Sequence, residues 1–78
     1  MTYRIIFSCT DHCSDGTYQV TSSLRVTIKT DSESINPVRV LYDWFNDKER
    51  LLVGKNSIVC YDAEGNISAV YTDIHFAD

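Results

Sequence analysis

Residues 17–29 carry the feature that most restricts the fold of this chain, a regular alternation of apolar and polar side chains. A period of two is that of a β-strand, because successive side chains of a strand point to opposite faces. One face is polar or charged throughout, and the other is apolar except for Ser22. Such a strand keeps one face for a core and one for water, as in antiparallel sheets. The apolar face comprises Tyr18, Val20, Leu24, Val26 and Ile28.

A second run with the same period precedes it and predicts a partner strand. Residues 3–9 place Tyr3, Ile5, Phe7 and Cys9 at alternate positions, and only Ile6 interrupts the pattern. Ile6 indicates some burial on the second face. The polar residues 11–16 end in a glycine, which suits a loop between two strands. We therefore predict a long hairpin at the start of the chain.

One helix is predicted over residues 36–48. Proline is favoured in the first turn of a helix, so Pro37 marks the start, and Asn36 or Ser34 is expected to cap it. Apolar side chains then recur with the spacing of one helical face. That face comprises Val38, Leu41, Tyr42 and Phe45, with Val40 and Trp44 as a second pair beside it.

The rest of the chain predicts a short strand and a second hairpin. Residues 51–53 are apolar, and the segments 57–61 and 67–76 flank a turn at 62–65 that has Asp first and Gly fourth. With Asp62 opposite Asn66, Cys60 should face Ser68 and Ile58 should face Val70. Ile74 and Phe76 continue that face, whereas Tyr71, Asp73 and His75 are expected to point the other way.

These elements predict one α+β domain over residues 1–78. An antiparallel sheet of four to five strands, with one helix packed on one face, buries every apolar stripe, in the order ββαββ or ββαβββ. A chain of 78 residues supports one core. A hydrophobic fraction of 44% is that of a folded protein.

Charge and cysteine content narrow the possible functions. A net charge of −4 argues against direct binding of DNA or RNA, which needs cations to neutralise phosphates. No apolar run predicts a signal peptide or a membrane span. Three cysteines are a poor count for a secreted disulfide framework, so we expect reduced thiols in the cytoplasm.

The reactive side chains do not form a recognisable catalytic motif. Cys9, His12 and Cys13 are the densest group and leave a small zinc-dependent or thiol-dependent protein as an alternative, but the paired spacing of a zinc knuckle is absent. Cysteines on an apolar strand face are usually core residues. The glycines are isolated, so no phosphate-binding loop is present. We expect neither an enzyme nor a cofactor.

Surface chemistry remains, and it points to a protein partner. Asp43, Asp47 and Glu49 make the end of the predicted helix acidic, which suits a basic partner surface. Trp44 either completes the core under the helix or is a partly exposed anchor, since Trp and Tyr dominate the energetics of interfaces. Tyr71 and Asp73, on the face of the last strand expected to be exposed, complete the predicted partner-binding set.

In size, acidity, single-helix α+β outline and lack of a catalytic motif, the chain resembles small phage-encoded host-takeover proteins, including many anti-CRISPR proteins. The resemblance is one of general profile over the whole chain, and no functional residue is transferred from it. It implies an inhibitor in the host cytoplasm that blocks a basic, nucleic-acid-binding surface of a larger protein or ribonucleoprotein, such as a CRISPR effector complex.

A homo-oligomeric structural module is the other alternative, with the chain then a homodimer rather than a monomer. If the strand at 17–29 lies at a sheet edge, its unpaired backbone groups are available for strand addition.

Overall fold

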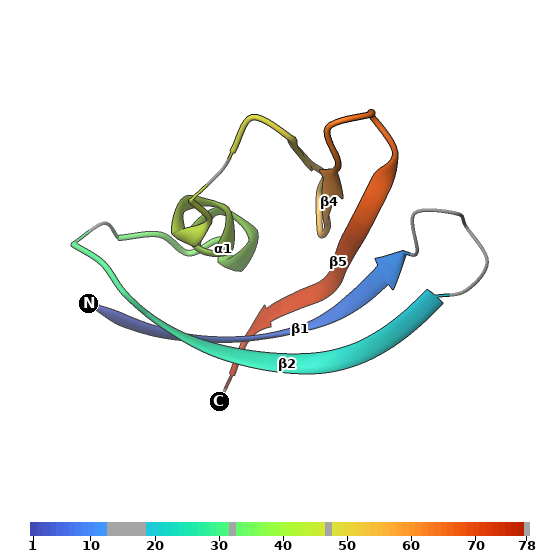
Figure 1. Cartoon of the computed structure of the whole chain (residues 1–78). Coiled ribbons are helices and arrows are strands. Elements are labelled where there is room, and N and C mark those ends of the chain that lie inside the picture. Colours follow the sequence, from blue (N-terminus) through green and yellow to red (C-terminus); the bar gives the residue numbers. More distant parts are fainter. Residues whose placement is uncertain (13–18, 32, 47, 78) are drawn as a thin grey trace.

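A computed structural model describes residues 1–12, 19–31, 33–46 and 48–77, and it has the predicted α+β fold. Five antiparallel strands form one sheet in the order β2-β1-β5-β4-β3, and the single helix α1 packs on one face (Figure 1). The chain order is ββαβββ. The elements are β1 (Thr2–His12), β2 (Gln19–Lys29), α1 (Pro37–Trp44), β3 (Leu51–Val53), β4 (Ile58–Tyr61) and β5 (Ile67–Phe76).

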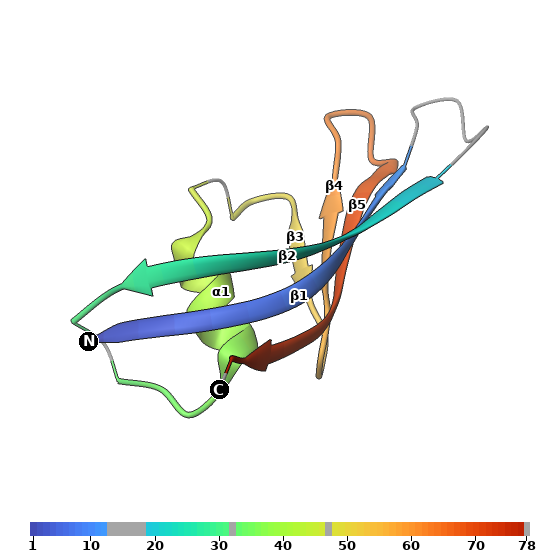
Figure 2. The ribbon, with the colours of Figure 1, turned by 90° about the horizontal axis from the view of Figure 1, so that it is seen from below.

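The first hairpin is a regular two-stranded ribbon. β1 and β2 pair without a register shift from Thr2 opposite Lys29 to His12 opposite Gln19. Residues 13–18, which include Tyr18 and the predicted loop glycine, lie outside the described residues. Both strands curve beneath the helix and continue well past its end (Figures 1 and 2).

The helix begins where the sequence predicts. The Asn36 side chain accepts a hydrogen bond from the Val38 N–H at 3.0 Å, and Pro37 occupies the first turn. Upstream, the Ser34 N–H donates to the Tyr3 hydroxyl, which ties the helix entry to β1. Asn36 is therefore the N-cap.

The helix ends earlier than predicted, at Trp44 rather than near residue 48. Phe45 has an extended backbone, with φ −67° and ψ 141°, and its ring lies 5.2 Å from that of Tyr71 on β5. The Lys48 Nζ donates to the Phe45 carbonyl oxygen at 2.8 Å. Packing of Phe45 on the sheet and this capping bond replace the last predicted turn.

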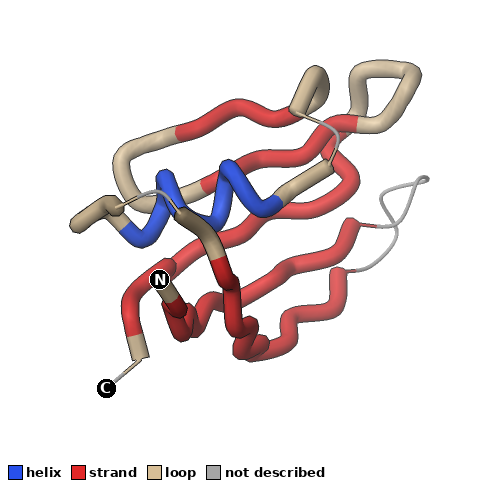
Figure 3. Tube along the Cα trace, turned by 90° about the vertical axis from the view of Figure 1, so that its left-hand side faces the viewer, coloured by secondary structure: helices blue, strands red, loops and turns tan. Residues whose placement is uncertain are grey.

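The core lies between the helix and the sheet. Ile5, Leu41 and Ile58 are fully buried, and each comes from a different element. Figure 3 shows the helix lying across the strands. The remaining core residues are Phe7, Cys9, Ile28, Val38, Val40, Ala69 and Ile74.

The second hairpin has the predicted turn. The Gly65 N–H donates to the Asp62 carbonyl at 3.1 Å, and the Asp62 side chain accepts from the N–H groups of Glu64 and Asn66. Gly65 has φ +86°, a conformation that side chains disfavour.

The predicted register of this hairpin is wrong because of the first of two bulges in β5. The first lies where the pairing shifts at Cys60, so that Cys60 faces Ala69 rather than Ser68, and Ile58 faces Tyr71 rather than Val70. The second lies around Asp73, where the backbone has φ 53° and the pairing with β1 shifts again.

The first bulge places Tyr71 on the helix side of the sheet, which contradicts the predicted outward orientation. The Tyr71 ring packs edge-on against Phe7 with the centroids 5.6 Å apart. Because the second bulge adds one residue, Ile74 is again buried on the same side. Both segments of β5 thus supply the core, although their side chains are out of phase.

The N-cap gives a stability prediction. Replacement of Asn36 by alanine leaves the Val38 N–H without its acceptor, so the free energy of unfolding should fall by about 1 kcal/mol. Urea titration measures this change in the free energy of unfolding. Asn56→Ala, at an exposed turn position, is the control and should change stability by less than about 0.5 kcal/mol. Equal effects of the two changes would show that the cap contributes nothing.

Candidate functional site

Among the exposed apolar side chains on the helix side of the sheet are two from β2 and one from the end of the helix. Val20 is 47% exposed, Leu24 43% and Trp44 47%. On β2, Leu24 pairs with the buried Phe7, which fixes it on the helix side. The helix covers Ile28 at one end of β2 but not the other end of the strand. The uncovered part of this face is the candidate site.

Trp44 stands at the centre of the site. It is the last residue of α1, and its ring lies 5.5 Å from the Phe45 ring. Its exposure supports the interpretation as a partly exposed anchor over burial beneath the helix. Trp44 is also the chain's one tryptophan, so its fluorescence reports on this site alone.

A groove with a volume of about 560 Å³ lies beside Trp44, over the middle of the sheet. The rings of Phe7, Tyr71 and Phe45 follow one another along it, with centroids 5.6 and 5.2 Å apart. Stacked and edge-on aromatic contacts of this kind make a firm surface. The lining residues are Phe7, Cys9, Asp11, Leu24, Val26, Trp44, Phe45, Asn46 and Tyr71.

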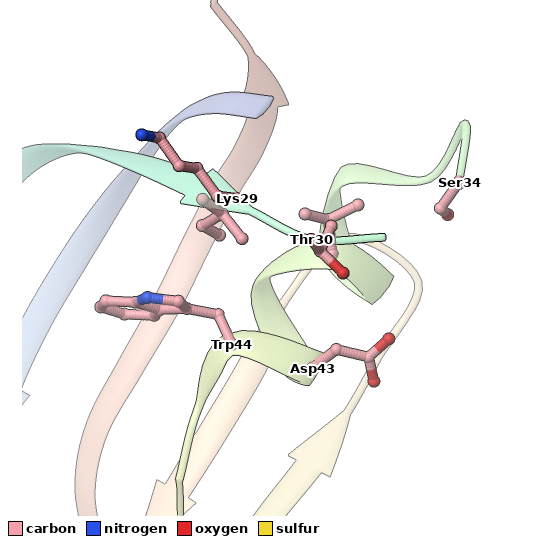
Figure 4. A pocket seen from close by; sticks show the side chains of 7 residues that line it. Lys29, Thr30, Ser34, Asp43 and Trp44 are labelled. Carbon is pink, nitrogen blue, oxygen red and sulfur yellow. The ribbon is translucent and has the colours of Figure 1, made fainter. Parts of the chain in front are cut away.

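A smaller pocket of about 250 Å³ lies on the other side of Trp44, between the end of β2 and the helix (Figure 4). Trp44 and Asp43 enter it from the last turn of α1, and Ile28 and Val40 are its buried apolar residues. Lys29, Thr30 and Ser34 complete the lining. Trp44 therefore separates two hollows on one face of the molecule.

The predicted acidic residues are only partly brought together with Trp44. Asp43 lies at the pocket and forms an ion pair with Arg39, one turn earlier, at 3.5 Å. Glu49 is exposed after the helix. Asp47 lies outside the described residues. The ion pair and the Lys48 capping bond offset part of the negative charge at the helix end.

The structure separates the two residues predicted on the last strand. Tyr71 joins Trp44 in lining the groove. Asp73 sits in the second bulge, is exposed, and has the His75 Nδ1 2.7 Å from its carbonyl oxygen. Asp73 is not among the residues that line either hollow as described.

Asp11, Leu24 and Asn46 also line the groove but were absent from the predicted set. For Leu24 a signal was present in the sequence. The apolar alternation of β2 extends over more residues than one short helix can cover, so part of that face has to remain exposed.

Cationic side chains gather on the opposite face of the first hairpin. Arg4 faces Thr27 across the β1–β2 ladder, and Arg25 and Lys29 lie on the same side as Thr27 because they are two residues away on either side. All three cations are exposed. Three of the seven Lys and Arg residues thus lie away from the groove.

Cys9 and His12 do not form a common site. They are three residues apart in β1, so their side chains leave opposite faces of the strand. Cys9 is buried on the helix side, and Cys60 is a half-buried free thiol. Cys13 lies outside the described residues. Within the described ranges, no three His, Cys, Asp or Glu side chains are grouped as metal ligands would be.

The Cys9 thiol is held in its neutral form. Burial raises its pKa above the ordinary value of 9.0, and the neighbouring Asp11 carboxylate, which accepts a hydrogen bond from the Cys9 Sγ at 3.7 Å, adds to the rise. Burial likewise raises the pKa of Tyr71, with the charges of Cys9, Cys60 and Asp11 adding to it. A protonated thiol is a poor nucleophile, which favours a packing role for Cys9.

No known family matched the chain, and no curated protein or solved structure matched it either. No helix in the described part of the chain is long and apolar enough to cross a membrane.

The raised pKa of Cys9 predicts a loss of stability in alkali. The unfolded thiol loses its proton near pH 9, whereas the folded thiol keeps it to a higher pH. The contribution of Cys9 is therefore complete below pH 9 and is lost as the pH rises through the folded-state value.

Urea unfolding of the reduced protein between pH 7 and 10.5 measures this effect. The difference in unfolding free energy between wild type and Cys9→Ala should shrink above pH 9. A difference that stays constant across this range would contradict the assignment.

Proposed function

We propose that this protein is a non-catalytic binding protein that docks its helix-bearing face against a basic surface of a larger protein or ribonucleoprotein and so blocks that surface. The observation that carries the proposal is the exposure of Trp44 between an aromatic groove and a second pocket. A docking inhibitor needs shape and anchors on its surface rather than reactive groups.

The geometry around Trp44 is that of an interface anchor. Tryptophan and tyrosine supply large contact areas at low cost in conformational entropy, and they recur among the residues that dominate binding energy. Trp44 is held at its base by the helix and by the Phe45 ring, while nearly half of its surface is open to solvent. A partner side chain can therefore pack on a ring that is already in place.

The distribution of charge indicates which face of the molecule approaches a basic partner. Asp11 lines the groove, and none of the described residues lining it is a lysine or arginine. Arg4 and Arg25 lie on the opposite face of the sheet, as does Lys29, which also borders the small pocket from the end of β2. A net charge of −4 is modest, but this segregation favours approach of a basic surface to the helix side.

The general resemblance to phage-encoded inhibitors supports the same kind of partner. It implies a nucleic-acid-binding surface. Such surfaces are basic because cations neutralise the phosphates, and the same requirement argues against nucleic acid as a direct ligand of this acidic chain. A CRISPR effector complex is one partner with such a surface.

Replacement of Trp44 by alanine tests the anchor. The tagged protein is incubated with the heparin-binding fraction of a bacterial lysate, which is enriched in basic, nucleic-acid-binding proteins. Wild type should retain a protein from this fraction, and Trp44→Ala should bind it about 30-fold more weakly, because an anchor residue contributes about 2 kcal/mol or more.

Leu52→Ala is the matched control. Leu52 is 59% exposed but lies on the edge strand β3 at the far end of the sheet, so its loss should leave binding unchanged. In the wild type, the partner should also shield Trp44 fluorescence from quenching by acrylamide. Equal retention by the wild type and Trp44→Ala, or no retention, would overturn the proposal.

Removal of acidic charge tests the electrostatic part separately. The double variant Asp43→Asn, Glu49→Gln should slow association with the retained partner several-fold at low salt and have little effect in 0.5 M salt, because salt screens exposed charges. Glu64→Gln, in the turn of the second hairpin, removes one exposed charge away from the site and is the control. Rates that do not depend on salt would contradict the charge argument.

A further inference from the structure

β2 is an edge strand with a long free side. In the sheet order β2-β1-β5-β4-β3, it pairs only with β1 among the described residues. All eleven residues of Gln19–Lys29 lie in one uninterrupted ladder with β1, and no bulge turns the edge away. A free edge of this length is a ready template for another strand.

Hydrogen bonds at the end of the hairpin show which residues face the free side. The Thr30 N–H donates to the Met1 carbonyl, and the Met1 amino group donates to the Thr30 carbonyl. Such mutually bonded pairs alternate with non-bonded pairs along an antiparallel ladder. Ile28, Val26, Leu24, Ser22 and Val20 therefore bond to β1.

The alternate residues of β2 direct their N–H and C=O groups outward. They have no strand partner among the described residues. These residues are Gln19, Thr21, Ser23, Arg25, Thr27 and Lys29.

We infer that two copies of this chain form a symmetric dimer by antiparallel pairing of their β2 edges, centred on Leu24. In this register Leu24 faces Leu24 of the second copy, and Ser23, Thr21 and Gln19 face Arg25, Thr27 and Lys29. Every outward N–H and C=O group then falls in a hydrogen-bonded pair, about twelve bonds in all.

Charge disfavours one neighbouring register, and the extent of pairing favours Leu24 over the other. A two-residue shift that centres the pairing on Arg25 sets Arg25 against itself, and like charges directly opposite each other are destabilising. Centring on Ser23 or Leu24 avoids that contact. Only the Leu24 register pairs all eleven residues of the strand.

The same register gives neighbours to the exposed apolar side chains of β2. Leu24, 43% exposed, meets its own copy in a non-hydrogen-bonded pair, where side chains lie closest. Val20, 47% exposed, faces Ile28, which lines the small pocket beside Trp44. A two-fold axis perpendicular to the sheet keeps both helices on the same face, so the two Trp44 side chains border one trough.

This inference concerns the purified protein alone, so its outcome is independent of the proposed partner. Sedimentation of the wild type should show a monomer–dimer equilibrium that depends on protein concentration. Leu24→Lys places like charges at the centre of the dimer and should weaken association at least about tenfold. Leu52→Lys makes the same change on the other edge strand and should leave the dimer intact, with circular dichroism confirming that both variants fold.

Disulfide cross-linking tests the register itself. Under mild oxidation, Leu24→Cys should give a covalent dimer well above the wild-type background from the native cysteines. Ser22→Cys lies two residues away on the same face, opposite Val26 of the second copy, and should stay at background. A wild type that is monomeric at several hundred micromolar, a dimer weakened by Leu52→Lys but not by Leu24→Lys, or cross-linking of Ser22→Cys alone would overturn the inference.

Discussion

The single helix is much shorter than the strands beneath it, and this difference in length leaves part of the sheet uncovered. An eight-residue helix is about 12 Å long, whereas an eleven-residue strand runs about 36 Å. The helix therefore buries Ile28 and leaves Leu24 and Val20 in solvent, although all three belong to one apolar stripe. The elongated shape, 40 × 24 × 19 Å, follows from the same mismatch. So does the open face on which Trp44 stands.

The fold was predictable from the sequence because its local signals agree. Alternation in residues 3–9 and 17–29, the Asn36 cap and the 62–65 turn each depend on a few neighbouring residues. Each has the predicted structure where the chain is described. The β5 register was not predictable in the same way. In the sequence, Ile74 and Phe76 fall on the same alternate positions as Val70. The bulge at Asp73 changes which side chains face the core, and because no glycine occupies the bulge, the sequence does not indicate it.

The candidate site was predictable only in part, because exposure depends on packing between distant elements. Trp44 occupies a helical position compatible with either the core or the surface, and the early end of α1, caused by the packing of Phe45 on Tyr71, leaves it exposed. Tyr71 was expected on the surface and instead lies in the wall of the groove, together with Trp44. Of the cations on the opposite face, Arg25 and Lys29 share the polar face of β2, and only Arg4 joins them through pairing with β1.

The two edges of the sheet differ in a way that bears on where this chain meets other chains. β3 has only three residues, and its neighbour β4 joins β5 through a bulged ladder, so that edge offers little backbone to a further strand. β2 has eleven residues, a continuous ladder and a composition rich in Thr, Ser and Val. Natural sheets commonly protect long edges with charge, and Arg25 and Lys29 are the two cations of β2. Arg25 disfavours pairing centred on itself, whereas pairing centred on Leu24 sets no two like charges directly opposite each other, so Arg25 biases the choice of register.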